Sequence, residues 1–367
     1  MSAVACFCIM CRMGVNLASR VGIVVAAFAV ALALHAEPVK VIFDTDMYTD
    51  FDDAGALACL HALADAGECE VLATIVNTRD CLSVAMCEII NAYYGRPGVL
   101  VGCAKSGGKS SSDGHVKRYG AIVDKYTKWV RHRNSSDAPD ATDVYRRVLA
   151  AQPDKSVVIC SVGFLNNMAA LLKSPSDGIS TLDGKSLVAQ KVKFWVAMAC
   201  KYPSGGEYNS KTDPESSRIA LESWPTLIVF SDYDYGKDCF AGRALAESGV
   251  EGNPVADVFR IGLPTREEIR KDPARSLRGG YGMGGRSAWD ETAVLVAVRG
   301  PERYFNVERG TYRMVGDGGS NEWAPDAENG PHLRITEKLS KTEVGHIIDE
   351  LMTRGPCKCE QGKVSKE

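Results

Sequence analysis

The chain lacks any cluster of lysine and arginine of the kind that follows a nucleic-acid backbone, and its formal net charge is −3. Because nucleic-acid affinity depends on such positive charge, no nucleic-acid partner is expected. Long apolar runs are scarce as well. The uncharged run at residues 21–34 is shorter than the roughly 20 residues that a membrane-spanning helix needs. It follows Arg12 and Arg20 and precedes Ala36, which is the pattern of an export signal.

We therefore expect residues 1–36 to be a signal peptide and the mature protein to be exported, either to the periplasm or into the medium. A retained membrane anchor is the alternative. Residues 37–355 have the length and composition of one large globular domain, and residues 356–367 form a charged tail. No membrane span is expected once the signal has been removed.

Of the 13 cysteines, Cys6, Cys8 and Cys11 lie in or before the signal, and the other ten do not show the spacing of a metal site. A domain of this length does not depend on disulfides, so most of the cysteines are expected to be small core residues. Cys357 and Cys359 in the tail are the exception, for which a strained bridge and free thiols both stay open. The cysteines therefore indicate no metal centre.

Strand-like and helix-like segments alternate along the chain. Continuous apolar strands between amphipathic helices predict an α/β fold, a Rossmann-like open, mostly parallel sheet with helices on both faces. The expected strands are at 39–44, 70–76, 98–102, 155–163, 192–199 and 226–231, and the expected helices at 54–67, 82–95, 166–174 and 238–248. Residues 104–138 are expected to be a loop, and the Gly-rich residues 277–287 a flap over a ligand site.

An acidic cluster in the sequence VIFDTDMYTDFDD, residues 41–53, follows the first strand. Helix N-termini favour carboxylates, so capping of the next helix by Asp50 or Asp52 explains one or two of its acids. Five carboxylates this close together need a cation or protons. An all-oxygen cluster suits Ca²⁺ or Mg²⁺ rather than zinc.

Other unusual polar residues also fall where predicted strands end. In open parallel sheets, ligands bind beyond the carboxyl ends of the strands. The clusters at these ends are residues 44–53, Asn77, residues 163–167 and residues 198–213. Their common position predicts one active site in one domain.

The acidic cluster at residues 41–53 resembles the signature of the inosine–uridine-type nucleoside hydrolases. That signature is an N-terminal DxD followed by DD and a helix. Here the pairs are Asp44-Thr45-Asp46 and Asp52-Asp53, with two more residues between them than in the commonest form. Three further stretches are similar in the same order: SVGFLNNMAALL (161–172), MACKYPSGGEYNSKTDPESSR (198–218) and RSAWDETAVLVAVRG (286–300). The resemblance spans residues 39–300.

The resemblance implies hydrolysis of the N-glycosidic bond of a ribonucleoside or related riboside, assisted by a Ca²⁺ cofactor. It assigns Asp46, Asp53 and Asp290 as carboxylate ligands and Asn166 as a ligand through its backbone carbonyl. Asp46 would also accept the proton of the attacking water, which is the part of a general base. Asp44 would orient the metal shell.

The same resemblance implies a set of residues that bind the substrate. Asp52 would bind the 2′ side of the ribose, Glu207 its 5′ end, and Met198 would lie under the sugar. The full set is Asp44, Asp52, Asn77, Met198, Glu207, Asn209 and Trp289. The expected partner is a small nucleoside or riboside, and homo-oligomerisation stays open.

Trp289 stands where this family usually has a histidine, which protonates the leaving base in purine-cleaving members. Tryptophan has no titratable group, and none of the mature chain's histidines lies in a matching motif. Purine cleavage with histidine as the acid is therefore not expected. Trp289 either stacks on an aromatic leaving group or fills the pocket wall. The substitute acids to consider are Tyr202, Tyr208, Tyr233 and Tyr235.

Two other functions stay open. One is an exported protein that binds nucleosides or sugars through the calcium site without turnover. The other is a phosphatase of the haloacid dehalogenase type, because VIFDTDM contains the strand and DxD pair of that class. That class continues with Gly-Thr, whereas Met47 and Tyr48 follow the pair here.

Overall fold

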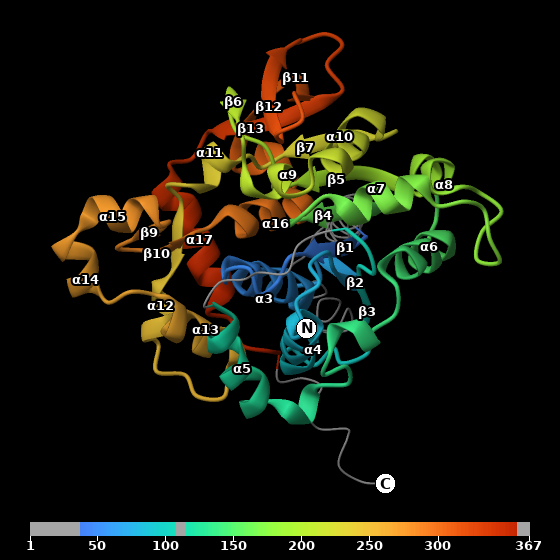
Figure 1. The fold of residues 1–367 in the computed structure, drawn as a ribbon. Helices are drawn as coiled ribbons and strands as arrows, with labels where there is room; N and C mark the ends of the chain where they lie inside the picture. The colour runs from blue at the N-terminus through green and yellow to red at the C-terminus, as the bar shows by residue number, and fades with distance from the viewer. Residues whose placement is uncertain (1–36, 108–114, 358–367) are drawn as a thin grey trace, which may run out of the picture. The chain divides into compact units, whose positions relative to one another are not determined.

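The computed structural model describes residues 37–107 and 115–357, and its compact unit starts at Val39. Ten strands form one sheet in the order β3-β2-β1-β4-β5-β7-β13-β11-β12-β6 (Figure 1). These strands are β1 (Val39–Thr45), β2 (Cys69–Val76), β3 (Leu100–Cys103), β4 (Val157–Ser161), β5 (Val192–Ala197), β6 (Ser204–Gly205), β7 (Leu227–Phe230), β11 (Phe305–Val315), β12 (Ser320–Pro325) and β13 (His332–Glu337). The predicted signal peptide and the tail from residue 358 lie outside the described residues.

The sheet is parallel from β3 to β13 and continues with β11, β12 and β6 as antiparallel strands. This confirms the predicted mostly parallel α/β class. The chain runs outward from β1 to β3 and then crosses back to place β4 on the other side of β1. Such a reversal opens a crevice at the carboxyl ends of the two central strands, where ligands bind in open α/β sheets.

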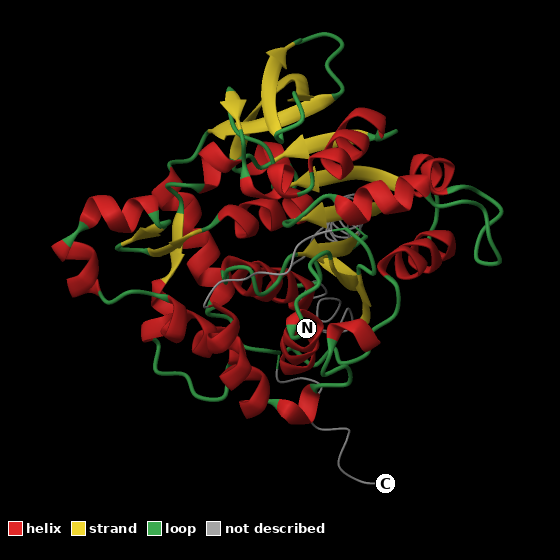
Figure 2. Cartoon of the chain, viewed as in Figure 1, coloured by secondary structure: helices red, strands yellow, loops and turns green. Residues whose placement is uncertain are grey.

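Helices cover both faces of the sheet (Figure 2). Val41 and Phe43 of β1 point into one apolar core and Ile42 into the other, as alternation along a strand requires. The first core includes α3 (Asp52–Asp65), α4 (Ser83–Tyr93), α5 (His115–Lys125), α13 (Pro254–Gly262), α16 (Trp289–Arg299) and α17 (Lys341–Met352). The second includes α6 (Ala141–Ala151), α7 (Asn166–Lys173), α8 (Gly184–Lys191) and α10 (Pro214–Ser223). Burial on both faces explains why the strands read as continuous apolar runs.

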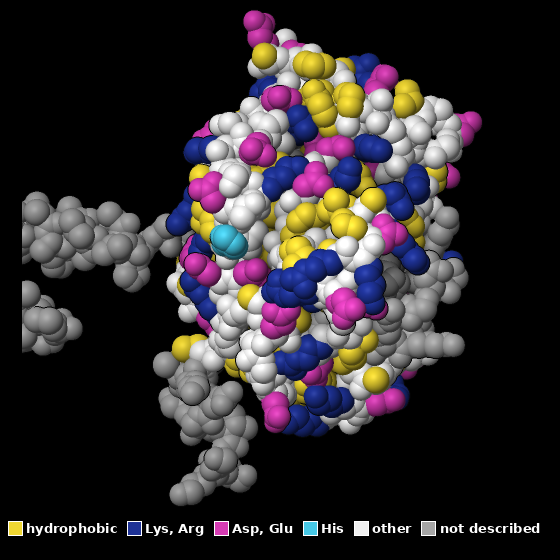
Figure 3. Space-filling model, turned by 90° about the vertical axis from the view of Figure 1, so that its left-hand side faces the viewer, with side chains coloured by type: hydrophobic (Ala, Val, Ile, Leu, Met, Phe, Trp, Pro, Cys, Tyr) yellow, Lys and Arg dark blue, Asp and Glu magenta, His cyan; other side chains and the backbone are white. Residues whose placement is uncertain are grey.

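The remaining elements are short. They are α9 (Tyr208–Thr212), α11 (Tyr233–Gly236), α12 (Arg243–Glu247), α14 (Arg266–Lys271), α15 (Pro273–Arg278), β8 (Phe240–Gly242), β9 (Tyr281–Gly282), β10 (Gly285–Ser287), η1 (Thr127–Trp129), η2 (Ser135–Asp137) and η3 (Pro301–Arg303). β8, β10 and β9 form a second, three-stranded sheet. The face drawn in Figure 3 has acidic and basic side chains interspersed, with apolar side chains between them.

Three predicted segments are wrong. Residues 238–248 were expected to be one helix, but β8 occupies the first part because it pairs with β10, and Gly242 at φ 93° separates it from α12. The Gly-rich segment 277–287 is not a separate flap, because it runs from the end of α15 into the β9–β10 hairpin of the same small sheet. The predicted loop 104–138 contains α5, whose Tyr119, Ile122 and Val123 pack into the first core.

The cysteines follow their prediction where the structure describes them. Those of the domain are free, and most are buried, as small core residues are. Cys357 is exposed and free, whereas Cys359 lies outside the described residues. In the described segments, no helix combines the length and hydrophobicity that crossing a membrane requires.

Candidate active site

A pocket of about 550 Å³, partly open to solvent, lies beyond the carboxyl ends of β1, β4 and β5. Its walls come from the loops that follow these strands, from the first residues of α3, α9, α11 and α16, and from β10. The lining residues are Asp46, Thr49, Asp50, Asp52, Val162, Met198, Glu207, Tyr208, Asn209, Tyr233, Arg286, Trp289 and Asp290. The predicted position of the site is therefore where the structure has its acidic pocket.

The loop between β1 and α3 holds Asp46 firmly. Tyr48 in this loop adopts φ 98°, a left-handed conformation that costs about 1–3 kcal/mol in a residue other than glycine. Its ring packs on Tyr119 with the centroids 4.8 Å apart. The backbone N–H of Thr49 donates to the Asp46 carbonyl at 3.0 Å, and its hydroxyl donates to Asp46 Oδ2 at 2.6 Å. The strained turn thus fixes the Asp46 carboxylate in the pocket wall.

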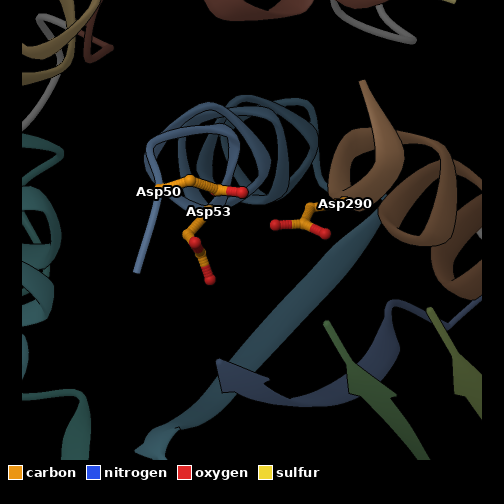
Figure 4. Close-up of side chains that lie close together, drawn as sticks. All are labelled: Asp50, Asp53 and Asp290. Carbon is orange, nitrogen blue, oxygen red and sulfur yellow. The ribbon is translucent and has the colours of Figure 1, made fainter. Parts of the chain in front are cut away.

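Three carboxylates meet where α3 and α16 begin. Oxygens of Asp50, Asp53 and Asp290 all lie within 4.8 Å of one another, and Figure 4 shows Asp50 and Asp290 directed toward each other with Asp53 beside them. Asp53 accepts a hydrogen bond from the Thr45 hydroxyl through Oδ1, while its Oδ2 is buried with no hydrogen-bond partner. The N-cap residue of α3 is Phe51, and its side chain makes no capping hydrogen bond to this helix. The alternative that Asp50 or Asp52 caps the helix is therefore wrong.

Burial raises the pKa of Asp46, Asp53 and Asp290 well above the usual range of a carboxyl, and the charges of neighbouring carboxylates, Asp50 among them in each case, raise it further. After burial, the largest cause that raises the pKa of Asp53 is the charge of Asp46. The resemblance assigned Asp46, Asp53 and Asp290 as the carboxylate ligands. In the structure, the three carboxylates that lie close together are those of Asp50, Asp53 and Asp290. The role of Asp46 as a metal ligand stays a prediction.

Arg286 is the residue of this site that the sequence did not reveal. Its guanidinium donates from Nη2 to Asp50 at 2.7 Å and from Nε to Asp52 at 3.2 Å, and it is almost fully buried. It comes from β10, in the hairpin that was expected to be a flap. The strand places one fixed positive charge among the carboxylates. The only signal in the sequence was that Arg286 is the first residue of the RSAWDE segment, which also contains Asp290.

Replacing Arg286 is expected to destabilise the protein strongly. Removing one partner of a buried ion pair costs about 3–5 kcal/mol, because the other charge is left without compensation. We therefore expect Arg286→Met to lower the free energy of unfolding by about that amount at pH 7 in urea titrations. Arg286→Lys keeps the charge and loses the two-pronged geometry, so its loss is expected to be smaller. Equal stability of Arg286→Met and the wild type would contradict the pairing.

Asp44 lies in a hydrogen-bonded cluster behind the pocket. It accepts hydrogen bonds from Asn77 Nδ2 at 2.6 Å, the Tyr145 hydroxyl at 2.8 Å and Asn167 Nδ2 at 2.9 Å. Burial raises the pKa of Asp44 to about 6 although these three donors oppose the shift. Among the described residues, the pocket lining includes neither Asp44 nor Asn77. Contact of Asp44 and Asn77 with substrate stays a prediction. In the structure, their hydrogen bonds support the pocket from behind.

Gly163 lets the loop after β4 approach Asp46 closely. A Cβ at this position would lie 2.4 Å from the backbone nitrogen of Asp46 and 2.7 Å from its Oδ1. We expect Gly163→Ala to destabilise the protein by about 1–3 kcal/mol, the usual range for overpacking, and to lower turnover by moving Asp46. Denaturant unfolding measures the first effect. Gly178→Ala is the control, since an added Cβ there meets nothing within 4 Å; equal losses in both variants would refute the close approach.

Asn166 begins α7 and its side-chain amide is held by neighbouring carbonyls. Its Nδ2 donates to the Asn77 carbonyl at 3.1 Å and to that of Ser106 at 3.4 Å. Its Oδ1 is buried and has no hydrogen-bond partner. Coordination of a cation through the backbone carbonyl of Asn166 stays a prediction. The side-chain oxygen of Asn166 is a second atom that could coordinate the cation.

Glu207, Asn209 and Met198 line one side of the pocket together. Glu207 caps α9, with its carboxylate accepting the backbone N–H of Asn209 at 2.7 Å and that of Ser210 at 3.0 Å. Asn209 Nδ2 donates to the Met198 carbonyl at 3.0 Å and lies 3.2 Å from its sulfur. These contacts fix the three side chains, whose binding of the ribose stays a prediction.

Trp289 belongs to an aromatic wall. Its ring stacks on Tyr233 with centroids 5.5 Å apart and an angle of 22° between the rings. Its indole N–H donates to the Tyr233 carbonyl at 3.0 Å and is therefore engaged inside the protein. Of the four tyrosines considered as acids, Tyr208 and Tyr233 line the pocket. Tyr202 and Tyr235 are not among the described residues that line the pocket, and the Tyr235 hydroxyl is buried.

The fold and the position of this site define a class: the chain has the fold of the nucleoside hydrolases. It is similar to an inosine-uridine preferring nucleoside hydrolase from Bacillus anthracis, with a TM-score of 0.61 and 15% identity over 85% of this chain and 98% of the other. A purine-preferring ribonucleoside hydrolase from Gardnerella vaginalis matches with a TM-score of 0.57 and 16% identity over 85% and 96% of the two chains. The type III effector protein XopQ, complexed with adenosine diphosphate ribose, matches with a TM-score of 0.61 and 15% identity over 89% and 96%.

No family model matches the sequence, and no curated protein matches it either. At identities this low, the likeness of the structures shows the fold. It agrees with the family resemblance that the sequence motifs carry. The activity has to be argued from the residues of the pocket.

Proposed function

We propose that the protein hydrolyses the N-glycosidic bond of a ribonucleoside or related riboside, with Ca²⁺ held in the acidic pocket. The observation that carries this proposal is the carboxylate group at the start of α3 and α16, where Asp50, Asp53 and Asp290 come within 4.8 Å of one another. It lies at the carboxyl ends of the central strands of a nucleoside hydrolase fold, next to the predicted base Asp46.

The donors of this group fit a hard divalent cation. All of them are oxygens, which Ca²⁺ and Mg²⁺ prefer, and Ca²⁺ tolerates the irregular arrangement that loops provide. Asp53 Oδ2 and Asn166 Oδ1 are buried without a hydrogen-bond partner, which is costly unless a ligand binds them. Asp46, Asp50, Asp53, Asp290 and Asn166 are the residues that would hold the ion. When bound, such an ion neutralises the carboxylates and lowers the pKa of a water molecule beside it.

Asp46 is the residue that would accept the proton of the attacking water. Its Oδ2 is engaged by the Thr49 hydroxyl, so the orientation of the carboxylate is set before substrate arrives. The water oxygen forms a bond to C1′ as the bond from C1′ to the base nitrogen breaks. The ribosyl group is cation-like during this exchange, and the surrounding carboxylates stabilise its positive charge.

The rest of the pocket would position the sugar. Glu207, Asn209 and Met198 are rigidly held on one wall, and Asp52 faces the pocket from the start of α3 with Arg286 beside it. Carboxylate and amide oxygens are suitable acceptors for ribose hydroxyls. Fixed partners of this kind hold C1′ near the water, which is a large part of the rate gain in such enzymes.

The test is to incubate the full-length protein and Ca²⁺ with a panel of ribosides and to measure the release of reducing sugar. Release from at least one riboside is expected, and Asp46→Asn serves as the inactive control. Saturable binding without sugar release would favour the non-catalytic binding protein. p-Nitrophenyl phosphate with Mg²⁺ is expected to yield no phosphate, and rapid release would favour the phosphatase alternative.

A further inference from the structure

The aromatic wall of the pocket offers little help to a leaving base that needs a proton. The indole N–H of Trp289 is bound to the Tyr233 carbonyl at 3.0 Å, so it does not point to a substrate. In the part of the chain that the structure describes, the pocket lining includes no histidine, lysine or cysteine. The phenols of Tyr208 and Tyr233 are the neutral donors next to this wall. A purine or pyrimidine without protonation departs as an anion, which is slow.

The same wall already attracts positive charge within the protein. The Lys201 ammonium lies 5.6 Å from the centre of the Tyr233 ring, and the Arg286 guanidinium lies 4.9 Å from that of Trp289. Aromatic faces attract cations through the negative charge of their π-electrons. Within the described residues, the Lys201 ammonium makes no ion pair, and its side chain is only half-buried. Lys201 is not one of the described residues that line the pocket, whereas Tyr233 and Trp289 are, so the aromatic side of the pocket is where a cationic ligand would be attracted.

Acidic residues dominate the charge of the pocket. Its lining has the single guanidinium of Arg286 against five carboxyl groups, those of Asp46, Asp50, Asp52, Glu207 and Asp290. The carboxylates are in excess even when a divalent cation is bound. A pocket lined by one sign of charge concentrates ligands of the opposite sign. This pocket therefore favours substrates that carry a positive charge.

We propose that the pocket selects ribosides whose leaving group is a cationic, N-quaternary aromatic ring, that is, pyridinium ribosides. This inference rests on the proposed hydrolase function and names its substrate class. Water forms the new bond to C1′ while the bond from C1′ to the ring nitrogen breaks. The electron pair of the broken bond stays on that nitrogen, so the ring leaves as a neutral pyridine without a proton. The proton of the water passes to Asp46 and then to solvent.

The first experiment compares ribosides of different leaving groups on the full-length protein with Ca²⁺. The probes are nicotinamide riboside, which is a pyridinium riboside, together with inosine, uridine and p-nitrophenyl riboside. A general acid contributes about 10²–10⁴-fold to such reactions. We expect kcat/KM for nicotinamide riboside to exceed those for inosine and uridine by at least about 10²-fold. Its turnover is also expected to release one proton into unbuffered solution at neutral pH, whereas inosine releases none.

The second experiment separates recognition of the charge from reactivity of the bond. The probes are 1-methylnicotinamide, a cation, and nicotinamide, its neutral counterpart, as competitive inhibitors of p-nitrophenyl riboside hydrolysis. We expect the cation to bind several-fold more tightly, with a difference that shrinks as salt is added. Equal inhibition constants for the two compounds would overturn the selection of positive charge.

A variant of Lys201 tests whether the pyridinium ring of the substrate binds next to Tyr233. Lys201→Met removes an ammonium that competes with the pyridinium for Tyr233, so KM for nicotinamide riboside is expected to fall several-fold while KM for uridine stays the same. Lys128→Met is the matched control, because the Lys128 ammonium lies 4.7 Å from the Trp129 ring outside the pocket lining. A similar fall for uridine, or for the Lys128 variant, would contradict the proposed position.

Failure of this inference and failure of the proposed function give different results. If p-nitrophenyl riboside is cleaved but nicotinamide riboside is no faster than inosine, the hydrolase function stands and the pyridinium selectivity is refuted. If none of the four ribosides releases sugar, the hydrolase function is refuted and the selectivity with it.

Discussion

The Asp46→Asn protein is expected to lose nearly all riboside hydrolysis while keeping its fold. Asparagine retains a side-chain oxygen for the Thr49 hydroxyl, which donates to Asp46 Oδ2 at 2.6 Å. It cannot accept the proton of the attacking water. Loss of a general base lowers kcat by about 10²–10⁴-fold, and steady-state kinetics on p-nitrophenyl riboside with saturating Ca²⁺ measures this. Asp124→Asn, at an exposed acid paired with Arg133, is the control that should retain full activity.

Asp50→Asn is the informative companion of this variant. The sequence offered Asp50 only as a possible cap of the next helix, but the structure pairs it with Arg286 and groups it with Asp53 and Asp290. We now expect Asp50→Asn to weaken cation binding and to recover activity at high Ca²⁺. If Asp50→Asn instead lost turnover at every Ca²⁺ concentration while Asp46→Asn retained it, the general base would be Asp50.

Removal of the cation is expected to lower the stability of the folded protein. A ligand that binds only the folded protein stabilises it by about 2.7 kcal/mol at 100 times its Kd. We therefore expect EDTA to lower Tm at neutral pH, and Ca²⁺ to restore both Tm and activity. Asp53→Asn should remove most of the Ca²⁺-induced rise in Tm, because Asp53 Oδ2 is a buried oxygen with no partner inside the protein.

The size of the Ca²⁺ effect is expected to increase with pH. Burial and the neighbouring carboxylates raise the pKa of Asp53 and Asp290, so without a cation the folded protein holds protons that the unfolded chain has released. Its stability is then highest below the usual aspartate pKa and falls as pH rises through the raised values. A cation replaces those protons and so binds more tightly at higher pH.

Thermal unfolding with and without Ca²⁺ at pH 5 and pH 8 measures this dependence. Asp349→Asn provides the control, since Asp349 is an aspartate whose pKa burial raises to about 6 but which does not line the described pocket. Its Ca²⁺-induced shift in Tm should match that of the wild type. An equal shift at both pH values, or one that persists in Asp53→Asn, would argue against these carboxylates as the binding site.

Much of the fold follows from local patterns. The strand around Val41 and the helix after Asp53 were predictable because side-chain periodicity reports burial within a single segment. The failures have a common cause. Phe240–Gly242 became β8 because it pairs with β10 across more than 40 residues of chain, and tertiary pairing overrides the helical pattern of the segment. The helix at residues 115–125 was not predicted because it lies in a polar stretch with few apolar side chains. Those few side chains are recognised as core residues only when the tertiary structure shows them packed in the first core.

The site shows the same division at the level of single residues. By itself, the sequence determined the α/β class and the position of the acidic site, because apolar periodicity and polar residues at strand ends are local properties. Only the tertiary structure decided that Asp50 joins Asp53 and Asp290, that Arg286 neutralises Asp50, and that the Trp289 N–H is bound to Tyr233. Arg286 and Asp50 are 236 residues apart in the chain. Contacts over such separations depend on how the β8–β10–β9 sheet and α16 pack against α3, and this geometry leaves no local pattern in the sequence.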